Sequence, residues 1–133
     1  MKALIVDDEF TSQLILQKLL MEYGETQVVS TGKEAVDAFS DALMLNEPFD
    51  LVCLDIMMPD IDGQQVLKEL RALEDMEGRH GEDAVKVIMI SSLSDKKNIM
   101  QAFKSQCEAY LVKPVDAPKL RKYLEDFGLL EKF

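Results

Sequence analysis

Four short apolar segments of the sequence are each followed by polar residues that could do chemistry. An acidic pair, a third aspartate, a serine and a lysine stand at these ends: Asp7 and Asp8 after 2–6, Asp55 after 50–54, Ser91 after 85–90 and Lys113 after 109–112. Like charges held close together need a cation to remain ionised. One divalent ion and the lysine would balance the three carboxylates, and oxygen ligands suit Mg²⁺. The set predicts a magnesium site at which an aspartate attacks phosphorus.

The elements that must bring these residues together follow a regular alternation. Apolar segments lie at 2–6, 26–29, 50–54, 85–90 and 109–112, and helical periodicity lies at 10–22, 32–45, 62–76, 95–104 and 117–127. Segments that are apolar almost throughout are typical of parallel strands covered on both faces. The pattern predicts one doubly wound α/β domain, (βα)5. In open α/β sheets, sites lie just beyond the carboxyl ends of the strands, where these polar residues fall.

Two local expectations concern burial. In the helix predicted at 10–22, we expect Leu14, Ile15 and Leu19 to supply part of the buried face. The charged stretch 74–83 is expected to be a solvated loop.

Composition limits the classes of partner. The 133 residues carry a net charge of −10, which argues against the broad basic surface that a nucleic acid or an anionic membrane requires. No apolar stretch has membrane-spanning length. Cys53 and Cys107 form no close-spaced pair, and Cys53 sits in an apolar run. We therefore expect a reduced, cytoplasmic chain with no direct contact to nucleic acid or membrane.

Four motifs in order resemble the receiver domain of two-component response regulators, including the stand-alone, CheY-like chemotaxis type. They are VDDE at 6–9, DIMMPDIDG at 55–63, IMISS at 88–92 and AYLVKP at 109–114. The resemblance covers essentially the whole chain. It implies a flavodoxin-like fold with a five-stranded parallel sheet in the order 2-1-3-4-5. It also implies a single receiver domain over 1–133 with no output domain.

The resemblance assigns roles to the residues at the strand ends. Asp55 is implied to accept a phosphoryl group, and Asp8 and Asp55 to ligate Mg²⁺ together with the main-chain carbonyl of Met57. Asp7 would act on the metal largely through water. Lys113 would contact the phosphoryl group, and its bond to the following proline is expected to be cis.

The resemblance also implies a switch rather than an enzyme. Ser91 and Tyr110 would be the switch pair, reshaping the face made by the fourth helix, fifth strand and fifth helix. The phosphoryl group would come from a sensor histidine kinase or a phosphotransfer protein, and a downstream protein would bind the reshaped face. The domain would catalyse only its own phosphorylation and dephosphorylation.

Some residues depart from the family pattern. Serine replaces the commoner threonine at 91, and Gln106 stands where glycine is frequent, so that turn is expected to be strained or differently built. Met57 and Leu93 flank the cleft at positions that influence hydrolysis in the family. Neither side chain can hold an attacking water by a strong hydrogen bond, which predicts a long-lived phosphoryl group on Asp55.

Two other functions remain open from the sequence. A Mg²⁺-dependent phosphatase also uses an aspartyl nucleophile, but enzymes of that class carry a D-x-D motif after the first strand. In this sequence Asp7 and Asp8 are adjacent, and no segment that could form a substrate cap is visible. A constitutive protein-binding module with a vestigial acid pocket is the other alternative, to which Gln106 lends some support.

Overall fold

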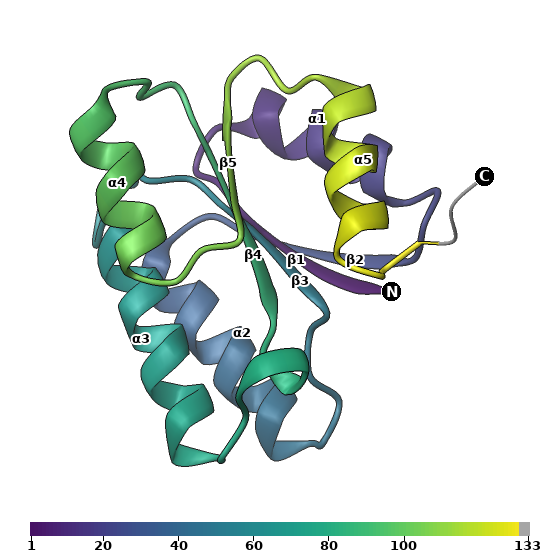
Figure 1. Ribbon diagram of the computed structural model, residues 1–133, viewed down its shortest axis with the longest axis vertical. Coiled ribbons are helices and arrows are strands. Elements are labelled where there is room, and N and C mark those ends of the chain that lie inside the picture. The colour runs from purple at the N-terminus through teal and green to yellow at the C-terminus, as the bar shows by residue number, and fades with distance from the viewer. Residues whose placement is uncertain (131–133) are drawn as a thin grey trace.

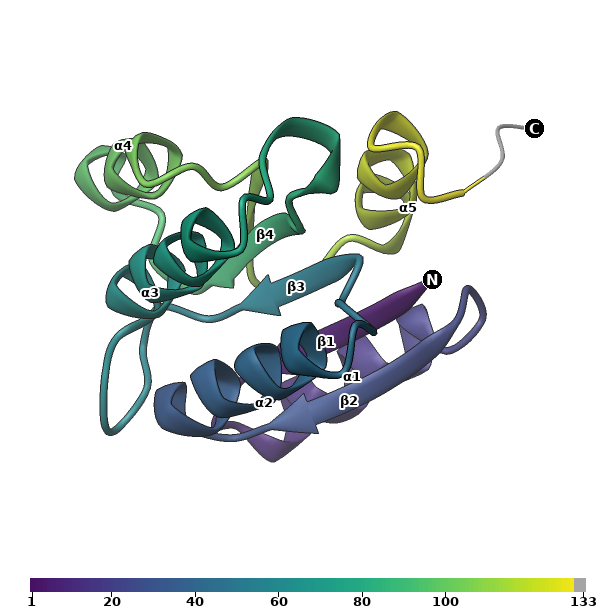
Figure 2. The ribbon, with the colours of Figure 1, turned by 90° about the horizontal axis from the view of Figure 1, so that it is seen from below.

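The computed structural model describes residues 1–130 of the chain, and within them a parallel sheet lies between two layers of helices (Figures 1 and 2). The strands are β1 (Lys2–Val6), β2 (Glu25–Val29), β3 (Leu51–Leu54), β4 (Lys86–Ser91) and β5 (Ala109–Val112), and the helices are α1 (Phe10–Leu20), α2 (Gly32–Met44), α3 (Gly63–Met76), α4 (Lys96–Lys104) and α5 (Ala117–Asp126). In the described residues the five strands are ordered β2-β1-β3-β4-β5. This confirms the predicted fold class and strand order.

Successive residues of the inner strands point to opposite faces of the sheet and feed two separate cores. In β1, Leu4 and Val6 pack on the side of α2 and α3, whereas Ala3 and Ile5 pack on the side of α1 and α5. Cys53, which lies in one of the apolar runs, belongs to the second core and is buried. Figure 1 shows α1 and α5 together on one side of the sheet and α2, α3 and α4 on the other. Both faces of the inner strands are therefore covered, which explains their continuous apolar runs.

The predicted element ends lie within two residues of the observed ones, but the buried face of α1 was predicted correctly only for Leu19. Leu14 and Ile15 are 48% and 47% exposed, while Leu16 and Leu20 fill the core and Leu19 packs against its edge. The apolar run from residue 14 to 16 points in several directions around the helix. Only one of these directions faces the sheet, so two large apolar side chains remain on the surface.

The charged stretch 74–83 is only partly the solvated loop that was expected. Its first residues complete α3, and Glu74 is 2% exposed. The Glu74 carboxylate accepts hydrogen bonds from Arg71 Nη1 and from the N–H of Val85, both at 2.6 Å. The rest of the stretch is mostly exposed and contains a short 3-10 helix, η1 (Gly81–Asp83).

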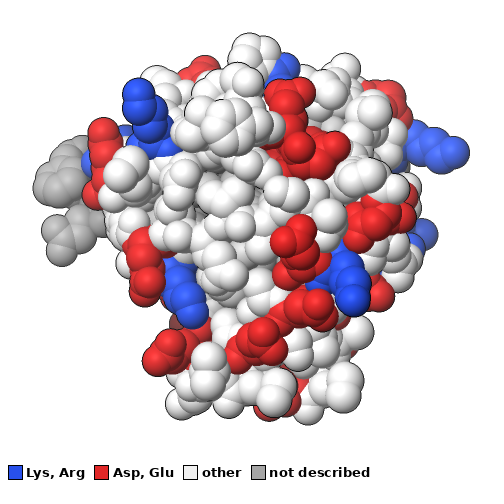
Figure 3. All heavy atoms as spheres, turned by 180° about the vertical axis from the view of Figure 1, so that it is seen from behind, with Lys and Arg blue, Asp and Glu red and all other residues white. Residues whose placement is uncertain are grey.

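The surface reflects the acidic composition. On the face drawn in Figure 3, acidic side chains are spread widely and the basic ones stand singly among them. Within residues 1–130, no helix has both the length and the apolar character that crossing a membrane requires.

Candidate functional site

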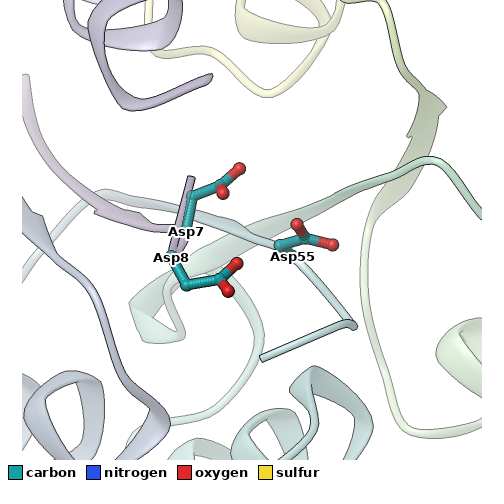
Figure 4. A group of neighbouring side chains, drawn as sticks. All are labelled: Asp7, Asp8 and Asp55. Carbon is teal, nitrogen blue, oxygen red and sulfur yellow. The ribbon is translucent and has the colours of Figure 1, made fainter. Parts of the chain in front are cut away.

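The register of the sheet brings the three aspartates together. β1 and β3 are neighbours, with Val6 opposite Leu54, so Asp7 and Asp55 leave adjacent strands at the same edge. The N–H of Asp55 donates to the carbonyl of Val6 at 3.0 Å. One carboxylate oxygen from each of Asp7, Asp8 and Asp55 lies within 4.8 Å of the other two. Figure 4 shows the carboxylates of Asp7 and Asp8 extending toward the side on which Asp55 lies.

Lys113 supplies the positive charge of the cluster. Its Nζ lies 2.8 Å from Asp7 Oδ2 and 2.9 Å from Asp55 Oδ2. The lysine follows the end of β5, and its N–H donates to the carbonyl of Ser91 at 2.9 Å. The bond from Lys113 to Pro114 is cis, as expected. The structure thus joins residues that are more than a hundred positions apart in the sequence.

Burial and hydrogen bonding set the protonation of this group. Burial raises the pKa of Asp7 above its usual value, and hydrogen bonds from Lys113 and from the N–H of Glu9 offset only part of that effect. Burial favours the neutral amine of Lys113, but the hydrogen bonds to Asp7 and Asp55 outweigh it and raise the pKa of this lysine. When all three carboxylates are ionised, Lys113 leaves a surplus of negative charge. A hard divalent cation with oxygen ligands fits this donor set.

The segment after β3 folds back tightly behind Asp55. Met57 N–H donates to Asp55 Oδ1 at 3.2 Å, and Gly63 N–H donates to the Ile56 carbonyl at 2.8 Å. A Cβ at residue 63 would lie 2.1 Å from the main-chain oxygen of Asp55, so only glycine permits this approach. Asp55 is 6% exposed, whereas Met57 is 55% exposed. A buried carboxylate and an exposed apolar side chain therefore line the same cleft.

A cleft of about 630 Å³ opens beside the cluster. The residues around it come from the end of β1, from α1 and from the segments that follow β3, β4 and β5: Asp8, Glu9, Thr11, Ser12, Ile15, Leu16, Asp55, Met57, Ser92, Lys113, Pro114 and Val115. Asp55 and Lys113 both line it, so a small anionic group entering the cleft meets the lysine and the carboxylate together.

Ser91 and Tyr110 lie next to this cluster but are tied to the loop after β4. Ser91 is fully buried, and its Oγ accepts a hydrogen bond from the N–H of Leu93 at 3.2 Å. Tyr110 donates its hydroxyl hydrogen to the Leu93 carbonyl at 2.7 Å, and burial raises the pKa of this phenol. Ser92, rather than Ser91, lines the cleft. The main chain of Leu93 is thus hydrogen-bonded to both members of the predicted switch pair.

Sequence reasoning missed two polar residues whose hydrogen bonds tie together the segments around the site. Gln13 Nε2 donates to the Asp7 carbonyl and, at 2.9 Å, to Ser30 Oγ. Asp60 accepts hydrogen bonds from the first N–H groups of α2. Asp60 stands inside the motif at 55–63, but its partner lies near residue 32, and only the three-dimensional arrangement shows the contact.

The strained turn expected at Gln106 is present. Its φ is +75°, a left-handed conformation that favours glycine. The carbonyl of Gln106 accepts hydrogen bonds from Arg71 Nε at 3.1 Å and from Arg71 Nη2 at 2.6 Å. Arg71 therefore fixes the turn that leads into β5.

The sequence profile of the response regulator receiver domain matches residues 3–125. The chain belongs to this family. It is a receiver domain of a two-component system, and receiver domains are signalling domains. The CheY homologue of Campylobacter jejuni strain 81-176 is 30% identical over 126 residues, which cover 95% of this chain and 91% of that protein.

Other relatives of this receiver domain are longer. The transcriptional regulatory protein ZraR of Escherichia coli K12 is 31% identical over 123 residues, covering 92% of this chain but 25% of that protein. The chain thus spans about a quarter of the length of ZraR.

Solved structures show the same fold. The receiver domain of the histidine kinase CKI1 from Arabidopsis thaliana, complexed with Mg²⁺ and BeF₃⁻, gives a TM-score of 0.84 at 24% identity, with 96% of this chain and 89% of that chain covered. The CheX–CheY–BeF₃–Mg²⁺ complex from Borrelia burgdorferi gives a TM-score of 0.75 at 28% identity, with the same coverage of 96% and 89%.

Proposed function

We propose that this receiver domain is a phosphorylation-activated switch whose phosphoacceptor is Asp55. The observation that carries the proposal is the position of Lys113, whose Nζ bridges Asp7 and Asp55 at 2.8 and 2.9 Å at the edge of an open cleft. A lysine held by two carboxylates is also placed to contact an anionic group that joins them.

Transfer to Asp55 follows from this geometry. An oxygen of Asp55 attacks phosphorus while the bond from phosphorus to the donor's histidine nitrogen breaks, and that nitrogen keeps the electron pair. The hydrogen bond from Met57 N–H holds the carboxylate in orientation. Lys113 remains within reach of the phosphoryl oxygens and offsets their charge. In this proposal the domain catalyses only its own phosphorylation and dephosphorylation.

A Mg²⁺ ion fits the carboxylate cluster. Asp8 and Asp55 would bind it by carboxylate and Met57 by its main-chain carbonyl, with Asp7 acting largely through water. When bound, the ion supplies positive charge that offsets the charge of the transferring group. The cluster of oxygens within 4.8 Å supports this assignment.

The phosphodonor is proposed to dock on exposed apolar side chains of α1 and of its C-cap residue, which together we call the α1 surface: Phe10, Leu14, Ile15 and Met21. Ile15 lines both the cleft beside Asp55 and a groove along α1. A histidine kinase or a phosphotransfer protein seated there could present its phosphohistidine to the cleft. Contiguous exposed apolar side chains are typical of protein interaction sites.

The output is proposed to leave through the α4–β5–α5 face. Met100 and Phe103 of α4 and Val112 of β5 are exposed there. Ser91 and Tyr110 would couple the cleft to this face, because both are hydrogen-bonded to Leu93 in the loop that precedes α4. Two states that differ by a few kcal/mol suffice for such a switch. A downstream protein would bind the favoured state.

Intact-mass measurement after incubation with acetyl phosphate and Mg²⁺ tests the proposal. We expect one phosphoryl group on the wild-type chain and none on an Asp55→Asn variant. Asp62→Asn is the matched control, because Asp62 is an exposed cap of α3 in the same segment. Turnover of phosphoesters would point to a hydrolase instead, and absence of any adduct would overturn the proposal in favour of a constitutive binding module.

A further inference from the structure

We infer that Asp60 is a positioning residue that fixes the segment carrying Met57 by tying it to the start of α2. The inference deepens the proposed function and rests on it, because it concerns how the main-chain carbonyl of Met57 is held ready for a metal ion. Asp60 itself is not a member of the carboxylate cluster.

The tie consists of two hydrogen bonds to one carboxylate. Asp60 Oδ1 accepts from the N–H of Gly32 and Oδ2 from the N–H of Lys33, each at 2.9 Å. These donors are the first two amides of α2, where the helix dipole also favours a negative charge. The same hydrogen bonds, that of Gly32 first, hold the pKa of Asp60 at about 2. The carboxylate is therefore ionised throughout the neutral range.

The helix does not need Asp60 merely as a cap. Thr31 already caps α2, since its Oγ1 accepts from the N–H of Glu34 at 3.1 Å. The Thr31 hydroxyl in turn donates to the Glu34 carboxylate at 3.0 Å. This local pair is contained within α2 and its N-cap residue, Thr31. Asp60 adds a link between the helix and a segment that is 28 residues away in sequence.

Close packing supports the link. A Cβ at residue 32 would lie 2.7 Å from Ile61 Cγ1 and 2.9 Å from Val66 Cγ2. Gly32 thus lets the segment from 57 to 62 approach the helix closely enough for Asp60 to reach both amides. The close packing at Gly32 and the hydrogen bonds of Asp60 therefore both hold this segment against the start of α2.

The segment around Met57 is consequently held at both ends. At its base, Gly63 N–H bonds the Ile56 carbonyl and Met57 N–H bonds Asp55 Oδ1. At its far end, Asp60 is fixed to α2. The intervening residues Met57 and Pro59 project to the surface, where little apolar packing restrains Met57. Without the Asp60 link, the Met57 carbonyl would sample more orientations, and a metal ion would have to order it.

Magnesium titration by calorimetry, together with thermal unfolding, separates this role from simple stabilisation. We expect Asp60→Ala to weaken Mg²⁺ binding on the order of tenfold, the range typical for residues that orient metal ligands. Asp60→Asn retains one acceptor oxygen, so its Mg²⁺ affinity should lie between that of the wild type and that of Asp60→Ala. Thr31→Ala, the matched control, removes a cap from the same helix and should lower the melting temperature without changing Mg²⁺ affinity.

Hydrogen exchange of the Met57 amide in metal-free protein gives a second readout. We expect faster exchange in Asp60→Ala than in the wild type or in Thr31→Ala. Equal Mg²⁺ affinity of Asp60→Ala and wild type, or an equal loss in Thr31→Ala, would overturn the inference while leaving the phosphoacceptor proposal intact. Failure of the wild type itself to bind Mg²⁺ would overturn both. If Asp60→Ala does not fold, Asp60→Asn decides by the same criteria.

Discussion

Tyr110 donates its hydroxyl hydrogen to the main-chain carbonyl of Leu93, 2.7 Å away, and so joins β5 to the loop before α4. We expect Tyr110→Phe to lower the free energy of unfolding by about 1 kcal/mol, the usual worth of such a bond. Urea denaturation measures the loss, and Tyr123→Phe on α5 is the control. A Tyr110→Phe variant as stable as the wild type would show that the bond contributes nothing.

The crowded carboxylates predict a stability gain on removing one of them. Asp55→Asn should raise the free energy of unfolding of the metal-free protein by about 1 kcal/mol, because a neutral amide avoids the cost of burying an ionised carboxylate beside two others. Added Mg²⁺ should stabilise the wild type more than the variant. Thermal unfolding with and without Mg²⁺ tests both statements. A variant less stable than the wild type without metal would contradict the first.

Met57 predicts a slow loss of the phosphoryl group. Its side chain is exposed at the cleft and offers no strong hydrogen bond to an attacking water. We expect Met57→Asn, which can orient a water, to shorten the lifetime of phosphorylated Asp55 by about tenfold. Loss of the phosphoryl mass with time measures the lifetime, with Met57→Leu as the control. A wild-type chain that dephosphorylates quickly, at a rate Met57→Asn hardly changes, would refute this.

Arg71 connects α3 to the entries of β4 and β5. It bonds the buried Glu74, lies 3.0 Å from Glu108 Oε2 and donates to the carbonyls of Val85 and Gln106. We expect Arg71→Met to lower the free energy of unfolding by about 3 kcal/mol, because it leaves the buried Glu74 carboxylate without its positively charged partner. Lys68→Met, at an exposed position of the same helix, should have little effect. Similar urea midpoints for the two variants would contradict this reading.

Asp60 predicts a pH dependence of stability in the acid range. Its pKa is held at about 2 in the folded chain, against an ordinary value of 3.8. Because the unfolded chain binds the proton more readily, the contribution of Asp60 is complete above the ordinary pKa and is lost as pH falls through the folded pKa. The difference in urea midpoint between wild type and Asp60→Asn should be constant above about pH 5 and shrink between about pH 4 and 2. A difference that does not change with pH would exclude this contribution.

The sequence was sufficient for the fold and for the residues at the strand ends, because strand order alone decides which ends meet. Once β1 and β3 are neighbours, Asp7 must lie near Asp55, and Lys113 follows a strand at the same edge. The assignment of chemical roles to these residues stays a prediction.

Features that depend on long-range contacts could not be predicted. Glu74 looked solvated because its neighbours in sequence are charged, yet its partners Arg71 and the N–H of Val85 draw it inside. Ile15 looked buried because it is apolar, but the helix turns it toward the cleft. Asp60 received no role from the sequence, since nothing nearby in the sequence indicates its bond to Gly32.

The sparse anchoring of α4 has a consequence for how a signal would leave the domain. Of its side chains only Ala102 is buried, and Gln64 donates to the carbonyl of Asn98 at 2.9 Å. Partial opening of this helix therefore exposes little apolar surface and requires little free energy compared with global unfolding. The proposed output face is therefore built partly on a helix that needs little free energy for sub-global opening, so a modest bias introduced at the cleft would redistribute its populations.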